Sequence, residues 1–142
     1  MAVPEPSSAL PANPRGCVLI VEDNPLNMKL FCAMVGSQGY DVLEASDGRA
    51  ALDLAHRQHP DLIIMDLQLP DMSGLDVTRS LKADADTSDI AIIATTAYAL
   101  RGDEEKIRAS GCDGYMAKPI AVSELLDLIE LLITLSPRAH TA

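Results

Sequence analysis

Short runs of almost wholly apolar residues recur along the chain from Cys17 onward. They are rich in β-branched residues and too short for buried helices, so each run predicts a β-strand. The clearest runs are 17–21 (CVLIV), 62–65 (LIIM) and 90–94 (IAIIA), and weaker ones are 41–45 (DVLEA) and 114–117 (GYMA). Strands that are apolar on both faces are typical of a parallel sheet that helices cover on both sides.

The segments between these runs place apolar residues at helical spacing. Residues that end helices follow four of them: Gly39 and Gly111 after the first and fourth segments, Pro60 and Pro137 after the second and fifth. The predicted helices cover residues 25–38, 48–59, 75–82, 103–110 and 123–135.

The alternation of strand and helix, repeated five times, predicts an α/β fold. Because the connection between parallel strands is right-handed, this repeat forms a doubly wound (βα)5 sandwich. Five strands favour the flavodoxin-like strand order 2-1-3-4-5 over the six-stranded dinucleotide-binding order. The 142 residues suit one domain, which we expect to span 17–135. We expect a flexible tail at 1–16, which holds four of the nine prolines, and a short C-terminal tail at 136–142.

Composition and charge exclude several kinds of function. Hydrophobic residues make up 48% of the chain and charged residues 23%, as in soluble globular proteins. The 11 Lys and Arg against 21 Asp and Glu give a formal net charge of -10, the wrong sign for neutralising nucleic-acid phosphates. No window approaches the ~20 consecutive apolar residues of a membrane span, and the N-terminus does not resemble a signal peptide. We therefore expect a soluble, cytoplasmic protein that binds neither nucleic acid nor membrane.

The cysteines predict neither disulfides nor a zinc site. Cys17, Cys32 and Cys112 are an odd number, form no CxxC pair, and lie far along the chain from His56 and His59. Both kinds of site need more ligands at tighter spacing. We expect free thiols in a reducing compartment.

Polar residues stand where the predicted strands end. They are Glu22 and Asp23 after the first strand, Asp66 after the third, Thr95 and Thr96 after the fourth, and Lys118 with Pro119 after the fifth. Ligands of open α/β sheets bind beyond the carboxyl ends of the strands, where the strand order reverses. The first and third strands are neighbours there, so Glu22, Asp23 and Asp66 should converge. Three carboxylates at close range repel one another, so either their pKa values rise or a cation binds, and oxygen ligands on a small, partly open site suit Mg²⁺.

Four separated motifs resemble the receiver domain of bacterial two-component response regulators. They are VLIVEDN (18–24), LIIMDLQLPDMSG (62–74), ATTAYA (94–99) and YMAKPI (115–120). The resemblance covers about residues 17–135, nearly all of the predicted domain. Within the family, NMKLF (27–31) and GDEEKIR (102–108) are most similar to the DivK-type single-domain regulators of cell-cycle phosphorelays.

The resemblance implies a phosphoryl acceptor beside a metal site. Asp66 would accept a phosphoryl group from a histidine of a kinase. Asp23 would be a direct Mg²⁺ ligand, Glu22 would act largely through metal-bound water, and the Gln68 carbonyl would be the third protein ligand. Phosphoryl transfer needs such a set, because its chief demands are a nucleophile, a divalent cation and fixed donors. Taken alone, an Asp at a strand end is more often a helix cap or a solvated loop residue.

The resemblance also implies residues that hold and report the phosphoryl group. Thr96 and Lys118 would bind its oxygens, and Tyr115 would swing inward when Thr96 moves. Thr95 is an alternative to Thr96, because neighbouring strand residues point to opposite faces. Tyr115 could equally cover an edge strand. A cis peptide bond before Pro119 would aim Lys118 at the site.

Other classes of protein share parts of this pattern. A phosphatase with a nucleophilic Asp would carry a second Asp two residues later, where this chain has Gln68. A flavodoxin would share the fold, but EDNPLN (22–27) stands where its Ser/Thr/Gly-rich phosphate loop would be. A receiver cut from a hybrid kinase is a third alternative. The initiating Met and the short ending SPRAHTA favour a free-standing protein.

The implied partners are a histidine kinase or histidine phosphotransferase and a downstream target protein. We expect a phosphoacceptor that assists its own phosphotransfer and dephosphorylation rather than an enzyme, and a monomer or weak dimer. The target should bind the surface of the fourth helix, fifth strand and fifth helix, about residues 102–110, Tyr115 and 122–135.

The first helix is expected to receive the phosphoryl donor, because it begins directly beside the acidic residues. Its core-facing residues are predicted to be Leu30, Phe31, Met34 and Val35. At about 100° per residue this choice turns Met28, Lys29 and Cys32 toward solvent. An exposed Met28 would then suit a transient contact, because methionine side chains are adaptable.

Overall fold

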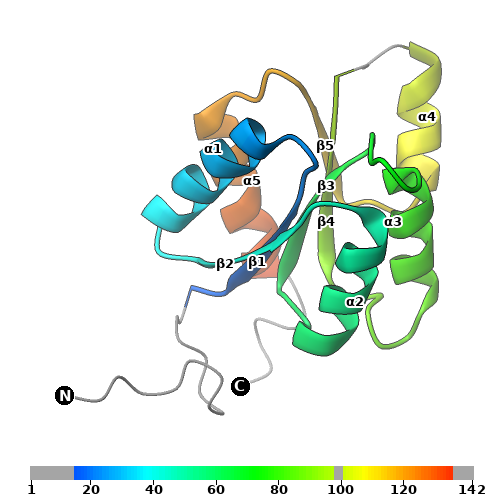
Figure 1. Ribbon diagram of the computed structural model, residues 1–142, viewed down its shortest axis with the longest axis horizontal. Coiled ribbons are helices and arrows are strands. Elements are labelled where there is room, and N and C mark those ends of the chain that lie inside the picture. The colour runs from blue at the N-terminus through cyan, green and yellow to red at the C-terminus, as the bar shows by residue number, and fades with distance from the viewer. Residues whose placement is uncertain (1–14, 98–100, 136–142) are drawn as a thin grey trace.

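The structure, a computed structural model, describes residues 15–97 and 101–135 (Figure 1). Five strands alternate with five helices along this part of the chain. The elements are β1 (Cys17–Val21), α1 (Pro25–Ser37), β2 (Asp41–Ala45), α2 (Gly48–Gln58), β3 (Leu62–Asp66), α3 (Gly74–Ala83), β4 (Ala91–Thr96), α4 (Arg101–Ala109), β5 (Gly114–Ala117) and α5 (Val122–Leu135). The expected tails at 1–16 and 136–142 lie almost wholly outside the described residues and stay predictions.

All strand pairs are parallel, and the sheet has the order β2-β1-β3-β4-β5. Helices α1 and α5 cover one face, and α2, α3 and α4 cover the other (Figure 1). The predicted doubly wound fold and its strand order are confirmed. Among the described residues, no helix is both long and apolar enough to cross a membrane.

Two hydrophobic clusters, one on each face of the sheet, follow from side-chain alternation along the strands. In β1, Val18 and Ile20 pack toward α1 and α5, whereas Leu19 and Val21 pack toward α2 and α3. All four are buried, which is why this strand has no polar position. The sheet is therefore the middle layer of the fold, with apolar side chains packed on both of its faces.

The predicted strand bounds hold for β1, β2 and β5 and change slightly for the other two. β3 extends one residue further, so that Asp66 is its last residue, and β4 runs to Thr96. In the register between them, Asp66 lies opposite Thr95. These polar residues thus belong to the sheet itself, and the backbone hydrogen bonds between its strands fix their positions.

The predicted orientation of α1 is wrong in part. Met28 is only 8% exposed and packs in the core with Phe31 and Val35, whereas Leu30 is 54% exposed. Positions 28, 31 and 35 lie on one helical face, and apolar residues on several other sides of this helix made that face hard to identify from the sequence. Met28 therefore cannot offer an exposed docking surface.

Candidate functional site

The carboxyl ends of β1, β3, β4 and β5 lie at one edge of the sheet (Figure 1). Glu22 directly follows β1, Asp66 ends β3 and Lys118 directly follows β5. Asp23, the residue after Glu22, is exposed, whereas Glu22 and Asp66 are each only 2% exposed. One carboxylate oxygen from each of these three acids lies within 4.8 Å of the others. Three oxygen ligands at this spacing, one of them open to solvent, fit a hard divalent cation.

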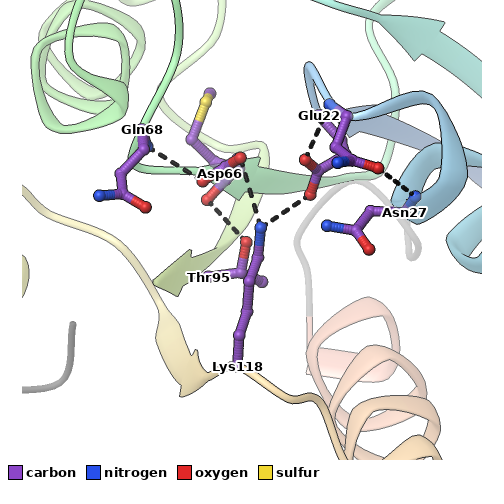
Figure 2. A network of polar contacts seen from close by, with 8 residues as sticks. Glu22, Asn27, Asp66, Gln68, Thr95 and Lys118 are labelled. Carbon is purple, nitrogen blue, oxygen red and sulfur yellow. Dashed lines mark hydrogen bonds and ion pairs between the residues drawn. The ribbon is translucent and has the colours of Figure 1, made fainter. Parts of the chain in front are cut away.

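Lys118 joins the two buried acids. Its Nζ lies 2.9 Å from Glu22 Oε1 and 3.4 Å from Asp66 Oδ2 (Figure 2). The peptide bond between Lys118 and Pro119 is cis. The lysine thus places one positive charge against two buried negative charges.

The pKa of Asp66 is raised to about 6, chiefly by burial and also by the negative charge of Glu22, against the opposing effects of the Gln68 N–H and Lys118. The Lys118 pKa is raised: burial would lower it, but the hydrogen bond to Glu22 and the charge of Asp66 outweigh that effect. The ammonium therefore stays charged at neutral pH. A second cation beside Asp66 would lower the free-energy cost of keeping this carboxylate ionised. Only the ionised carboxylate is nucleophilic.

The main chain around Glu22 fixes the entry into α1. The Glu22 N–H donates to the Ala45 carbonyl at 3.0 Å, and Glu22 Oε2 accepts from the Asn24 N–H at 3.1 Å. Asn24 in turn caps α1, because its Oδ1 accepts from the Asn27 N–H at 3.0 Å. Glu22 is thus held by three different partners, including Lys118 (Figure 2).

A loop of residues 67–73 connects β3 to α3 and passes directly over Asp66. The Gln68 N–H donates to Asp66 Oδ1 at 3.0 Å, while the Gln68 side chain is exposed (Figure 2). The loop closes where the Gly74 N–H donates to the Leu67 carbonyl at 3.1 Å. A side chain on Gly74 would collide with the Asp66 carbonyl, so this close approach requires glycine.

The two threonines of β4 are both buried. The Thr95 hydroxyl lies 3.5 Å from the Met65 carbonyl, to which it donates (Figure 2). The Thr96 carbonyl accepts from the Lys118 N–H at 2.7 Å, which ties β4 to the residue that carries the site's ammonium. Thr96 therefore lies in the backbone frame of the site, next to Lys118.

Tyr115 lies apart from the carboxylates, on β5 facing α4. Its hydroxyl hydrogen-bonds with Glu104, and this contact is the main cause of its raised pKa. Arg108 forms an ion pair with Glu104 at 2.8 Å, and its Cζ lies 5.8 Å from the centre of the Tyr115 ring. Sequence reasoning missed Glu104 and Arg108. Their only signal was the acid and base four residues apart on a helix, a spacing that is common on exposed helices.

Comparison with known proteins identifies the class to which this fold and site belong. The model of the response regulator receiver domain family matches residues 18–130, and the chain belongs to that family. Proteins of this family are phosphoacceptors of two-component signalling rather than conventional enzymes.

Individual relatives show which members of the family this chain resembles. The chain is 51% identical over 113 residues to the polar-differentiation response regulator DivK of Brucella ovis, which covers 80% of this chain and 92% of that protein. A solved relative is the receiver domain of the sensor histidine kinase PA1611 from Pseudomonas aeruginosa, with magnesium in its active-site cleft. It is 39% identical, has a TM-score of 0.78, and covers 84% of this chain and 98% of that chain. A CheY-like receiver domain from Methanospirillum hungatei, with a TM-score of 0.78 and 24% identity, covers 83% of this chain and 93% of that chain and shows the shared fold.

Proposed function

We propose that this protein is a response regulator that accepts a phosphoryl group on Asp66 from a phosphohistidine of a kinase or phosphotransferase. One observation carries the proposal: a buried aspartate at the end of β3 lies among two further carboxylates and one lysine ammonium. In the reaction a bond forms from an Asp66 carboxylate oxygen to phosphorus, and the bond from phosphorus to the histidine nitrogen breaks. The histidine nitrogen keeps that electron pair, and the product is an acyl phosphate.

We assign Mg²⁺ to the acidic cluster, with Asp23, Asp66 and the Gln68 carbonyl as ligands and Glu22 acting through bound water. The cluster fits the ion because its donors are oxygens and one of them is exposed. The magnesium in the PA1611 receiver supports this assignment. When bound, the ion neutralises charge on the carboxylates and on the incoming phosphoryl oxygens.

Lys118 and Thr96 are assigned to the phosphoryl oxygens. The Lys118 ammonium is already 3.4 Å from Asp66 Oδ2, so it lies close enough to contact the oxygens of a phosphoryl group that bonds to this carboxylate. The backbone bond between Lys118 and Thr96 couples β4 to β5 at this point. An inward shift of Thr96 toward the phosphoryl group would open space for the Tyr115 ring, and phosphorylation would favour that state.

We further propose that the signal passes by protein contact. The match extends over 92% of the DivK relative, a response regulator with little chain outside the matched region, and this likeness supports signalling through the surface of the domain itself. The target would bind the surface of α4, β5 and α5, where Tyr115 lies. The phosphoryl donor would bind α1, where Leu26 and Leu30 are 65% and 54% exposed and take the part that sequence reasoning gave to Met28.

The test is labelling by a small phosphodonor. Incubation with acetyl phosphate and Mg²⁺ should add the mass of one phosphoryl group to the intact protein. Excess chelator should suppress the label, because the carboxylate cluster then repels the donor. Equal labelling with and without chelator would contradict the metal assignment, and no labelling in either case would contradict the proposed function.

A further inference from the structure

Asp71 lies outside the carboxylate cluster, at the tip of the loop between β3 and α3, and binds the start of α2. Its Oδ1 accepts from the Gly48 N–H at 2.8 Å and its Oδ2 accepts from the Arg49 N–H at 3.0 Å. The N-cap of α2, Asp47, separately accepts from the Ala50 N–H at 2.8 Å. The first turn of α2 is thus capped by two carboxylates, one local and one from a loop more than twenty residues later in the chain.

The loop that carries Asp71 also carries Gln68. At its base, the loop is held by the hydrogen bond from Gly74 to Leu67 and by a bridge between Gln68 and Ser73. These bonds hold the two ends of the loop together, and Leu69 and Met72 of the tip between them pack partly against the hydrophobic cluster on this face of the sheet. The tip is also tied to α2.

Two contacts join the tip of the loop to α2. One is the pair of hydrogen bonds to Asp71. The other is the packing of the Met72 side chain on Gly48, where any larger residue would collide with it. α2 and α3 pack against each other on the same face of the sheet (Figure 1), so this anchor joins two neighbouring elements.

We propose that Asp71 is a positioning residue for the phosphoryl site: by fastening the tip of the loop to α2, it fixes the Gln68 carbonyl relative to Asp23 and Asp66. This inference rests on the proposed function, in which that carbonyl is a Mg²⁺ ligand. Mg²⁺ demands nearly ideal octahedral geometry at 2.0–2.1 Å, roughly, so a carbonyl on a loosely held loop binds it poorly. Groups that orient ligands from outside the metal's own shell typically change affinity by about 10–100-fold.

A simpler role for Asp71 would be to stabilise α2 alone. Asp47 separates the two roles, because it caps the same first turn and, within the part of the chain that the structure describes, forms no hydrogen bond with the loop. Asp47→Ala removes one cap from α2 and leaves the loop anchor in place. Asp71→Ala removes a comparable cap and also removes the hydrogen bonds between the tip of the loop and α2, while the packing of Leu69 and Met72 remains. Asp71→Asn keeps one acceptor oxygen and should have an intermediate effect.

The experiment is a Mg²⁺ titration of the 15N-labelled proteins without any phosphodonor, followed by the NMR shifts of backbone amides near Asp66. Asp71→Ala should raise the apparent Kd for Mg²⁺ about tenfold, and Asp71→Asn should raise it less. Asp47→Ala should lower the unfolding temperature and leave the Kd within about twofold of wild type. Thermal unfolding of each variant shows that it is folded, and Asp71→Asn decides the question if Asp71→Ala does not fold.

Three results would overturn the inference: an unchanged Kd in the folded Asp71 variants, an equal rise in the Asp47 and Asp71 variants, or no Mg²⁺ binding by wild type. The proposed function fails in a different way. If wild type binds Mg²⁺ and Asp71→Ala weakens that binding, but acetyl phosphate adds no label, Asp71 still positions a metal site and the phosphoacceptor role is wrong.

Discussion

The carboxylate cluster and the surroundings of Tyr115 belong to the same proposed switch but are held in opposite ways. Glu22 and Asp66 are each 2% exposed, and each has several hydrogen-bond or ionic partners. Glu104 and Arg108, which hold Tyr115, form an ion pair with side chains 45% and 69% exposed. Burial makes electrostatic interactions strong and their geometry fixed, whereas solvent makes an exposed pair weak and easy to exchange.

This contrast suits the two tasks. A phosphoryl acceptor needs groups that are in place before the donor arrives, because reorganisation during the reaction would raise the barrier. A switch needs two states of similar free energy, so that one modification can change their populations. Single substitutions in the carboxylate cluster should therefore have large effects on phosphorylation or stability. Substitutions around Tyr115 should change the stability little but should change the conformation of the tyrosine clearly.

The largest expected effect is at Asp66. Asp66→Asn should abolish labelling by acetyl phosphate completely, because an amide cannot form the acyl phosphate. The variant should stay folded, since it removes a buried charge. Intact-mass spectrometry measures the label, and Asp53→Asn, a change on the exposed surface of α2, is the control that should label like wild type. A labelled Asp66→Asn protein would place the nucleophile elsewhere.

The next effect is at Lys118. Lys118→Met leaves Glu22 and Asp66 buried without their cation and should lower the free energy of unfolding at pH 7 by about 3 kcal/mol. Labelling should slow as well, and phosphorylation should lose its effect on Tyr115. The matched control is Arg79→Met, which breaks the exposed ion pair with Asp76 and should cost less than about 1 kcal/mol. Urea unfolding of both variants tests the difference, and equal losses would mean that burial does not strengthen the cluster.

A smaller effect concerns pH. The pKa of Asp66 is raised to about 6, so between its ordinary value and pH 6 the folded protein binds more protons at this site than the unfolded chain does. The contribution of Asp66 to stability is therefore present at low pH and is lost as pH rises through about 6, by roughly 3 kcal/mol in all. Urea unfolding from pH 4 to pH 7 should show this decline in wild type relative to Asp66→Asn. Parallel curves would mean that Asp66 has an ordinary pKa.

The smallest effect on stability is at Glu104. Glu104→Gln should leave labelling and thermal unfolding nearly unchanged, because the pair is exposed. It should lower the pKa of Tyr115, since the hydrogen bond to Glu104 is the main cause that raises it. An NMR titration of the Tyr115 ring measures this shift, with Glu105→Gln as the neighbouring control. A Tyr115 pKa unchanged by Glu104→Gln would show that the tyrosine is held by other contacts.

The sequence predicted the strands well where apolar residues follow one another along the chain. The apolar runs of β1, β3 and β4 located these strands to within two residues, the weaker segments of β2 and β5 gave correct bounds, and strand order followed from the alternation of strands and helices. The convergence of the strand ends followed from that order. α1 was less predictable, because Leu26 and Leu30 are apolar and yet exposed, so hydrophobicity alone could not identify its buried face.

Contacts between segments that are far apart along the chain could not be predicted from the sequence. Asp71 reads as an ordinary turn residue between Pro70 and Met72 until the fold brings the start of α2 beside it. The hydrogen bond between Glu104 and Tyr115 likewise depends on how α4 lies on β5. Such partners depend on the packing of whole elements, for which a single sequence carries no local pattern.

The identity of the phosphorylated residue is the most direct test of all. Wild type labelled by acetyl phosphate with Mg²⁺ can be reduced with borohydride, which converts an aspartyl phosphate to homoserine and so marks the residue permanently. Peptide mass spectrometry should find homoserine at position 66 and at no other aspartate. Homoserine at Asp23 or Asp71 instead, or no homoserine in a protein that carries the label, would contradict the assignment of Asp66 as the phosphoryl acceptor.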